Sequence, residues 1–131
     1  MKENEIKITI PSSLQNVSII RAMLKAYFEH EHVDKHDSFQ LLTVIDELST
    51  NVVEHGYKYS RGNIIIRIEK EEHEISLVVE DNGIGFDDSK LSKEEGGLGL
   101  QIARNIADTF VIEKKENGTC FRFKKKIREV I

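Results

Sequence analysis

Residues 64–80 of the chain read IIIRIEKEEHEISLVVE, two runs rich in β-branched residues on either side of the polar Glu71-Glu72-His73. Short runs of this kind, separated by a few polar residues, predict a β-hairpin. A second hairpin is predicted over residues 110–127, because Asn117-Gly118 lies between two alternating runs and this dipeptide is a strong turn signal. Residues 5–10 alternate apolar with polar side chains and predict a further strand, which Pro11 ends.

Three helices are predicted between and beside these strands. After a cap at Ser12 or Ser13, apolar residues at three-to-four spacing predict a helix from Leu14 to about His30. A cap at Asp34 or Asp37 begins a second helix that ends near Gly56. Its predicted apolar stripe is Phe39, Leu42, Ile45, Leu48 and Val52. A third helix is expected from Leu98 or Gly99 to Asp108.

This order of elements favours the α+β class. We expect a two-layer sandwich, with a mixed, mostly antiparallel sheet and about three helices on one face. The chain has 131 residues, a length that suits one domain spanning residues 1–131.

Composition excludes several classes of protein. The net charge of −4 disfavours direct nucleic-acid binding, which needs a basic footprint. The longest apolar run, residues 64–66, is far shorter than the ~20 residues of a membrane-spanning helix. Cys120 is the single cysteine, so no internal disulfide can form, and the polar residues 1–5 lack the apolar core of a signal peptide. We therefore expect a cytoplasmic protein that does not bind membranes.

Three segments are unusual for a purely structural domain. In the first, residues 47–55, the spacing of Glu47, Asn51 and His55 puts them on one helical stripe at the border of the core. Such a stripe is ordinarily a solvated face. The alternative is a carboxylate and an amide that converge on a ligand or a metal.

The other two segments are rich in glycine. Residues 81–86, Asp-Asn-Gly-Ile-Gly-Phe, follow a predicted strand directly, so a carboxylate stands beside backbone that can approach a ligand closely. Residues 96–100, Gly-Gly-Leu-Gly-Leu, lead into a helix whose free N–H groups suit phosphate. A glycine turn and a flexible hinge are the ordinary alternatives. Neither a P-loop nor a G-x-G-x-x-G motif occurs.

Together, and in this order, the three segments resemble the GHKL-type ATPase domain of histidine kinases, gyrase and MutL. Residues 47–56 match E-L-x-x-N-x-x-x-H-G, residues 81–86 match D-x-G-x-G-F, and residues 96–100 match the glycine box, with a later G-T turn at Gly118-Thr119. The resemblance runs from residue 6 to about 127. More narrowly, the chain looks like the stand-alone anti-sigma factor serine/threonine kinases. This resemblance implies the Bergerat fold, which is also called the histidine kinase-like ATPase fold.

The resemblance also implies roles for individual residues. Glu47 would be the catalytic base, and the oxygen of Asn51 would bind Mg²⁺. Asp81 would accept a hydrogen bond from the adenine amino group, with Thr119 as a second, partly water-mediated contact. Residues 87–96 would form a lid over the phosphates. The implied ATP-binding set is Asn51, Asp81, Gly83, Gly85, Gly97, Leu98, Gly99, Leu100 and Thr119.

One feature departs from the family pattern. Some members carry an arginine directly before the glycine box, where this chain has Glu95. The cations of the expected lid are Lys90 and Lys93.

The function that the resemblance implies is a Mg·ATP-dependent protein serine/threonine kinase. It would phosphorylate a serine of a STAS-type anti-sigma factor antagonist and would sequester a sigma factor; homodimers are common in that family. The alternative is an ATP-binding regulatory interaction module with little or no kinase activity.

Overall fold

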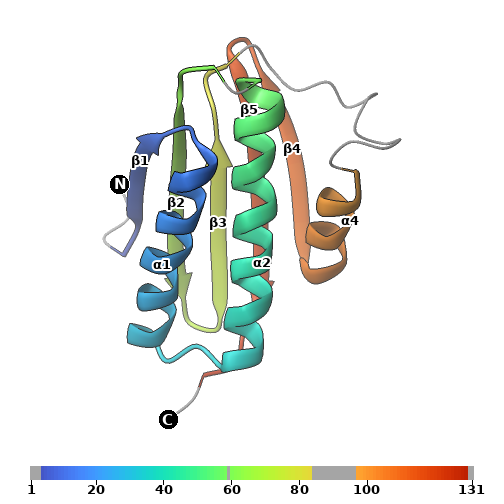
Figure 1. Ribbon diagram of the computed structural model, residues 1–131. Coiled ribbons are helices and arrows are strands. Elements are labelled where there is room, and N and C mark those ends of the chain that lie inside the picture. The colour runs from blue at the N-terminus through green and yellow to red at the C-terminus, as the bar shows by residue number, and fades with distance from the viewer. Residues whose placement is uncertain (1–3, 59, 84–96, 130–131) are drawn as a thin grey trace.

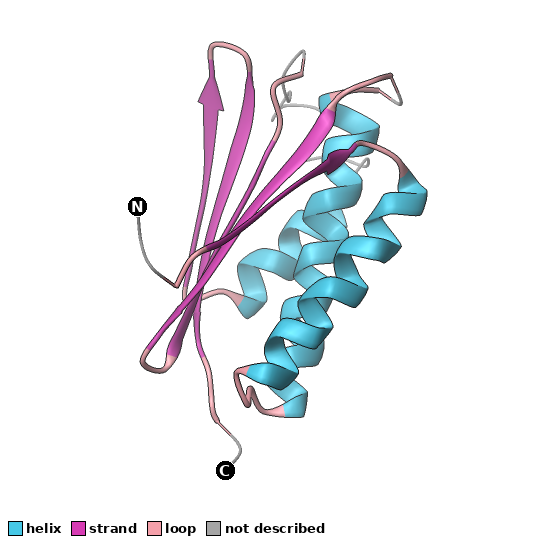
Figure 2. Ribbon diagram, turned by 90° about the vertical axis from the view of Figure 1, so that its left-hand side faces the viewer, coloured by secondary structure: helices cyan, strands magenta, loops and turns pink. Residues whose placement is uncertain are grey.

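The computed structural model describes residues 4–58, 60–83 and 97–129, which form two layers. A sheet forms one layer, and the helices cover one of its faces (Figures 1 and 2), which confirms the predicted α+β sandwich. The elements in chain order are β1 (Ile6–Pro11), α1 (Leu14–His30), α2 (Lys35–Asn51), η1 (Val52–Gly56), β2 (Asn63–Glu71), β3 (Glu74–Glu80), α4 (Gly97–Ile106), β4 (Thr109–Lys115) and β5 (Gly118–Lys126). Among the described helices, none is long and apolar enough to cross a membrane.

The five strands lie in the order β1-β2-β3-β5-β4, and every pairing is antiparallel. Both predicted hairpins, β2–β3 and β4–β5, are confirmed, whereas the expected mixed character is not found among these strands. β5 lies against β3 with Glu80 opposite Cys120. This register brings the chain that follows β3 beside the start of β5.

The core lies between the sheet and the helices. Alternate residues of the central strands face the helices, because side chains of a strand alternate between its two faces. Fully or almost fully buried examples are Ile64, Ile66, Ile68, Ile75, Leu77, Val79, Phe121 and Phe123. α1 contributes Val17, Ile20, Leu24 and Phe28 at helical spacing.

The two long helices begin at capping side chains that the sequence predicted. Ser13 accepts a hydrogen bond from the N–H of Asn16 at 3.1 Å, and Asp34 accepts from the N–H groups of His36 and Asp37. Phe39, however, is 63% exposed, so its predicted place in the core stripe is wrong. The other predicted positions, Leu42, Ile45, Leu48 and Val52, are buried as expected. Three-residue steps drift around a helix of 3.6 residues per turn, so Phe39 falls outside the buried face, which also includes Leu41 and Val44.

α2 does not stop at Asn51 but continues as the π-helical turn η1 to Gly56, where the sequence predicted its end. The N–H of Tyr57 donates to the carbonyl of Val52 at 3.0 Å, the five-residue step of a π-helix. Such a turn rotates less per residue than an α-helix. The α-helical spacing that put His55 on one stripe with Glu47 and Asn51 therefore does not hold past Asn51.

Candidate functional site

The side chain of Asp81 faces the helices, because side chains along β3 alternate between the two faces of the sheet. The inward residues of that strand are Ile75, Leu77 and Val79. Asp81 is the next inward position and is only 1% exposed. Its backbone N–H donates to the carbonyl of Thr119 on β5 at 3.0 Å. A buried carboxylate thus stands at the upper edge of the sheet, between two central strands.

The two carboxylate oxygens of Asp81 have different surroundings. Oδ1 accepts the N–H of Gly83 at 2.9 Å, and no described residue donates a hydrogen bond to Oδ2. A Cβ built on Gly56 would lie 2.8 Å from Oδ2, so the end of η1 runs directly past this oxygen. Burial raises the pKa of Asp81, although the Gly83 N–H, the charge of Lys115 and the backbone of Thr119 oppose the rise.

Thr119 places a hydroxyl beside this carboxylate. The residue is fully buried, and its Oγ1 has no hydrogen-bond partner in the described part of the chain. A buried hydroxyl without a partner is costly and therefore uncommon. The preceding Gly118 has a φ of 108°, and a Cβ there would lie 2.0 Å from the carbonyl oxygen of Asp81. The close approach of these two segments needs glycine. Among the described residues, Oδ2 of Asp81 has no donor and the Thr119 hydroxyl has no partner.

Glu47 and Asn51 lie one turn apart on α2, as predicted. Asn51 is 3% exposed, and its Nδ2 donates to the backbone carbonyl of Glu47 at 2.9 Å. The donor side of the amide is used within the helix, so the side-chain oxygen is left as the group that can meet a ligand.

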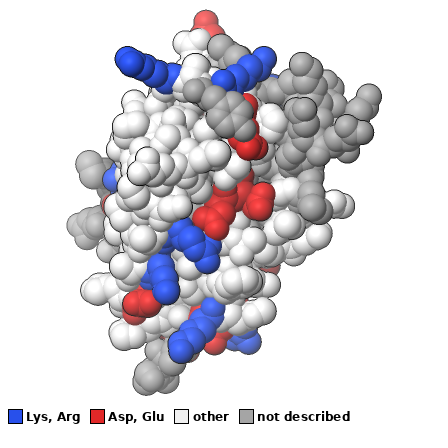
Figure 3. All heavy atoms as spheres, viewed as in Figure 1, with Lys and Arg blue, Asp and Glu red and all other residues white. Residues whose placement is uncertain are grey.

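The carboxyl group of Glu47 lies in an acidic neighbourhood. Burial raises its pKa, and the negative charges of Asp46 and Glu54 raise it further. Asp46 is itself paired with Arg21 of α1 at 2.6 Å. Figure 3 shows acidic side chains gathered over the upper part of α2 and basic ones below them. A carboxylate with a raised pKa is a stronger base than an ordinary glutamate.

The first turn of α4 packs against Glu47. A Cβ built on Gly99 would lie 2.3 Å from Oε2 of Glu47 and 3.2 Å from its Cδ. The position is therefore restricted to glycine as long as the carboxylate keeps this place. Helix N-termini present free N–H groups, and here that end of α4 meets a carboxylate.

The residues present fit a magnesium ion that is bound mainly through a nucleotide. In the described segments, no cluster of three or more His, Cys, Asp or Glu side chains could hold a metal. Mg²⁺ prefers oxygen ligands and commonly keeps phosphates and water in its octahedron. The side-chain oxygen of Asn51 is a group of that kind.

Several predicted site residues cannot be compared with the structure. Gly85 and the expected lid, residues 87–96 with Lys90, Lys93 and Glu95, lie outside the described residues. Gly97 and Leu98 form the start of α4. Leu100 is 2% exposed and belongs to the core, so a contact of Leu100 with a ligand would have to come from its backbone.

Tyr57 is a residue of this region that the sequence did not single out. It is 7% exposed, follows Gly56 directly, and contacts the loop that carries Asp81. An aromatic residue directly after the E-L-x-x-N-x-x-x-H-G segment was the available signal, but its partners are distant in the chain.

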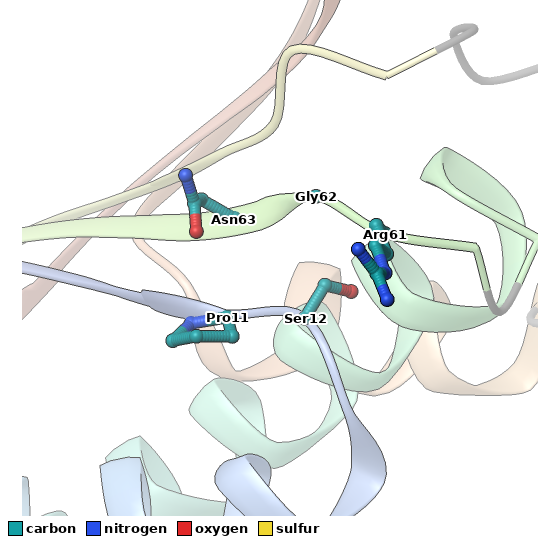
Figure 4. Close-up of a pocket in the computed structure, with 5 residues that line it drawn as sticks. All are labelled: Pro11, Ser12, Arg61, Gly62 and Asn63. Carbon is teal, nitrogen blue, oxygen red and sulfur yellow. The ribbon is translucent and has the colours of Figure 1, made fainter.

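A pocket of about 490 Å³ lies between the end of β1 and the start of β2, lined by Pro11, Ser12, Arg61, Gly62 and Asn63 (Figure 4). The side chains of Ser12 and Arg61 point toward one another across it. None of the predicted site residues lines it, so it is separate from the Asp81 and Glu47 region.

Comparison with a family model gives a match to the description "histidine kinase-like ATPase domain" over residues 10–125. Two curated relatives are each named "Anti-sigma F factor". The relative from Clostridium kluyveri is 29% identical over 136 residues, which cover 95% of this chain and 96% of that protein. The relative from Bacillus licheniformis is 29% identical over 135 residues, which cover 94% and 92%.

Two solved structures share the fold. The crystal structure of the RsbU and RsbW domains of Rv1364c from Mycobacterium tuberculosis has a TM-score of 0.75 at 22% identity; the match covers 97% of this chain and 34% of that one. The histidine kinase domain of the blue-light activated kinase from Erythrobacter litoralis EL346 has a TM-score of 0.60 at 11% identity, over 85% and 61%. At these identities the likeness concerns the fold alone.

Proposed function

The chain belongs to the histidine kinase-like ATPase domain family, and from this premise we propose that it is a Mg·ATP-dependent protein serine/threonine kinase of the anti-sigma factor type. Its substrate is a serine of a STAS-type anti-sigma factor antagonist, and its second partner is a sigma factor that it sequesters. The similarity to curated anti-sigma F factors over nearly their whole length supports this choice within the family.

One observation carries the proposal: Glu47 and Asn51 on α2, the first turn of α4, and the Asp81–Thr119 pair lie along one continuous path. Gly99 brings α4 to Glu47, and Gly56 brings the end of the same α2–η1 segment to Asp81. A nucleotide with its base at Asp81 and its phosphates toward α4 would meet all of these groups.

At the base end, Asp81 and Thr119 recognise adenine. Oδ2 of Asp81, to which no described residue donates, accepts a hydrogen bond from the exocyclic amino group. The base also gives the Thr119 hydroxyl the hydrogen-bond partner that it lacks among the described residues. Gly83 and Gly85 keep side chains away from the base.

At the phosphate end, Asn51 directs its side-chain oxygen to Mg²⁺, which neutralises phosphate charge when bound. Backbone N–H groups of residues 97–100 bind phosphate oxygens at the start of α4. Glu47 takes the proton of the attacking serine hydroxyl. The serine oxygen forms a bond to the γ-phosphorus, the bond to the β–γ bridging oxygen breaks, and ADP leaves with the electron pair of that bond.

The test is phosphate transfer from Mg·[γ-³²P]ATP to candidate STAS proteins of the same genome. Wild type should label one of them. Glu47→Gln should keep nucleotide affinity and lose transfer by ~10²–10⁴-fold, the usual range for a general base. Glu72→Gln, in the exposed turn at the other end of the sheet, is the matched control and should transfer as wild type does.

The alternative, an ATP-binding interaction module, predicts a different pattern in the same assay. Nucleotide would bind, no STAS protein would be labelled, and Glu47→Gln would equal wild type in every readout. That pattern would overturn the kinase assignment and leave the nucleotide site standing.

A further inference from the structure

Three consecutive backbone N–H groups after β3 are each held by a different acceptor. The N–H of Asp81 donates to the carbonyl of Thr119 at 3.0 Å, and that of Gly83 donates to Oδ1 of Asp81 at 2.9 Å. Between them, the N–H of Asn82 donates to the hydroxyl oxygen of Tyr57 at 2.9 Å. Of the three acceptors, the Tyr57 hydroxyl alone belongs to the segment that follows α2.

The Tyr57 hydroxyl is fixed from both sides. It donates its own proton to the backbone carbonyl of Asn63 at 2.8 Å while it accepts from Asn82, a residue 25 positions away in the sequence. A phenol has one proton to donate, so the direction of both bonds is determined. The hydroxyl therefore links the start of β2 to the loop that carries Asp81.

The ring of Tyr57 is also closely packed. A Cβ built on Gly62 would lie 2.1 Å from the ring, and one built on Gly83 would lie 2.8 Å from it. Two glycines thus lie directly against the ring. The π-helical turn Val52–Gly56 delivers it there, through the hydrogen bond from the Tyr57 N–H to the carbonyl of Val52.

We infer that Tyr57 is a positioning residue for recognition of the nucleotide base: it holds Asn82 and Gly83 so that Oδ2 of Asp81 faces the base. Few contacts connect Tyr57 to the carboxylate of Asp81. Tyr57 fixes the N–H of Asn82, the next N–H occupies Oδ1 of Asp81, and the carboxylate is thereby oriented. The inference rests on the proposed nucleotide site, and Tyr57 itself is given no contact with the nucleotide.

Tyr57→Phe removes both hydrogen bonds of the hydroxyl and keeps the ring against Gly62 and Gly83. A second tyrosine offers a matched control. Tyr27, on α1, is half-buried, and its hydroxyl lies by the backbone of Lys70, near the β2–β3 turn at the other end of the sheet. Tyr27→Phe therefore removes a partly buried tyrosine hydroxyl at a distance from Asp81.

The experiment measures dissociation constants of ADP and IDP, whose bases differ at the exocyclic group, by calorimetry for wild type and both variants. Tyr57→Phe should weaken ADP binding by roughly 5- to 30-fold, the effect of losing one to two hydrogen bonds. It should also reduce the preference for ADP over IDP, which loss of general stability would not do. AMP and Mg·ATP should weaken by the same factor, because the phosphate end is unaffected. Tyr27→Phe should change none of these values.

A second variant approaches the ring without touching the hydroxyl. In Gly62→Ala the added methyl group would lie 2.1 Å from the ring and must displace it, so this variant should change ADP affinity and base preference in the same direction. If Tyr57→Phe fails to fold, Gly62→Ala still tests whether the position of Tyr57 affects recognition of the base.

The outcomes separate the inference from the function on which it rests. If wild type binds ADP and Asp81→Asn weakens it, but Tyr57→Phe matches Tyr27→Phe in affinity and base preference, the inference is wrong and the nucleotide site stands. If wild type binds neither ADP nor ATP, both fail. A lower melting temperature with an unchanged ADP to IDP ratio would reduce Tyr57 to a structural residue and also overturn the inference.

Discussion

The Cα of Gly99 lies so close to Glu47 that a methyl group on it would come within 2.3 Å of Oε2. The first turn of α4 and the carboxylate of α2 therefore share one small space. This contact is with the far end of a flexible side chain and not with backbone. A larger residue at position 99 would displace the carboxylate and would disturb the fold far less.

Gly99→Ala should consequently separate stability from activity. Alanine favours a helix over glycine by about 1 kcal/mol, which offsets the cost of moving the Glu47 side chain. Phosphate transfer should fall by about 10²-fold, because a misplacement of about 1 Å at a reacting group has that effect. Thermal melting and single-turnover transfer, measured on the same preparation, test this. Full transfer in a folded Gly99→Ala protein would show that the carboxylate does not need its present place.

The raised pKa of Glu47 predicts the acid side of the pH–activity profile. Burial is the main cause, followed by the charges of Asp46 and Glu54. As a base, Glu47 must be ionised, so transfer should decline on acidification at a higher pH than an ordinary glutamate would give. Glu54→Gln removes one of the neighbouring charges and should move this decline to lower pH. Profiles of kcat for wild type and Glu54→Gln provide the comparison; superimposable acid limbs would argue against Glu47 as the titrating base.

The sequence predicted those parts of the fold and site that are encoded locally. Both hairpins follow from runs of β-branched residues and from Asn117-Gly118, and the caps at Ser13 and Asp34 from their own side chains. The positions of Glu47 and Asp81 could also be predicted locally. Glu47 lies on one face of a helix, and Asp81 lies at the end of a strand, and both elements are predictable from the sequence.

What the sequence did not predict depends on contacts between distant segments. The contacts of the Tyr57 ring with Gly62 and Gly83 exist only after β2 and β3 pair and Tyr57, at the end of η1, packs against both segments. The π-helical turn is equally invisible to a search at 3.6-residue spacing. Phe39 was misplaced because three-residue steps drift around a helix of 3.6 residues per turn, which puts the first position of the predicted stripe outside the buried face.

Nucleotide should stabilise the wild-type protein in a way that depends on Mg²⁺. A ligand that binds only the folded state, at 100 times its dissociation constant, adds about 2.7 kcal/mol to the free energy of unfolding. Melting curves with Mg·ATP should therefore shift upward. In Asn51→Ala, the added shift that Mg²⁺ gives over ATP alone should disappear, because Asn51 supplies the protein's oxygen ligand. GTP serves as the control for the base, since its exocyclic oxygen cannot donate to Asp81.

Asp81→Asn should have opposite effects on stability and on binding. Burial raises the pKa of Asp81 above its ordinary value of 3.8, so the folded protein holds this proton more tightly than the unfolded chain does. The carboxyl group favours folding most below its unfolded pKa, and this advantage is lost as pH rises through the folded pKa. At pH 7 the buried charge therefore costs stability.

The asparagine keeps an acceptor for the Gly83 N–H and carries no charge. Without nucleotide, Asp81→Asn should melt at a higher temperature than wild type at pH 7, and the difference should shrink as the pH is lowered toward 4. With Mg·ATP the order should reverse, because loss of the acceptor to the adenine amino group weakens binding by about 1–3 kcal/mol. A variant that melts below wild type at pH 7 without nucleotide would mean that Lys115 and the Gly83 N–H outweigh burial.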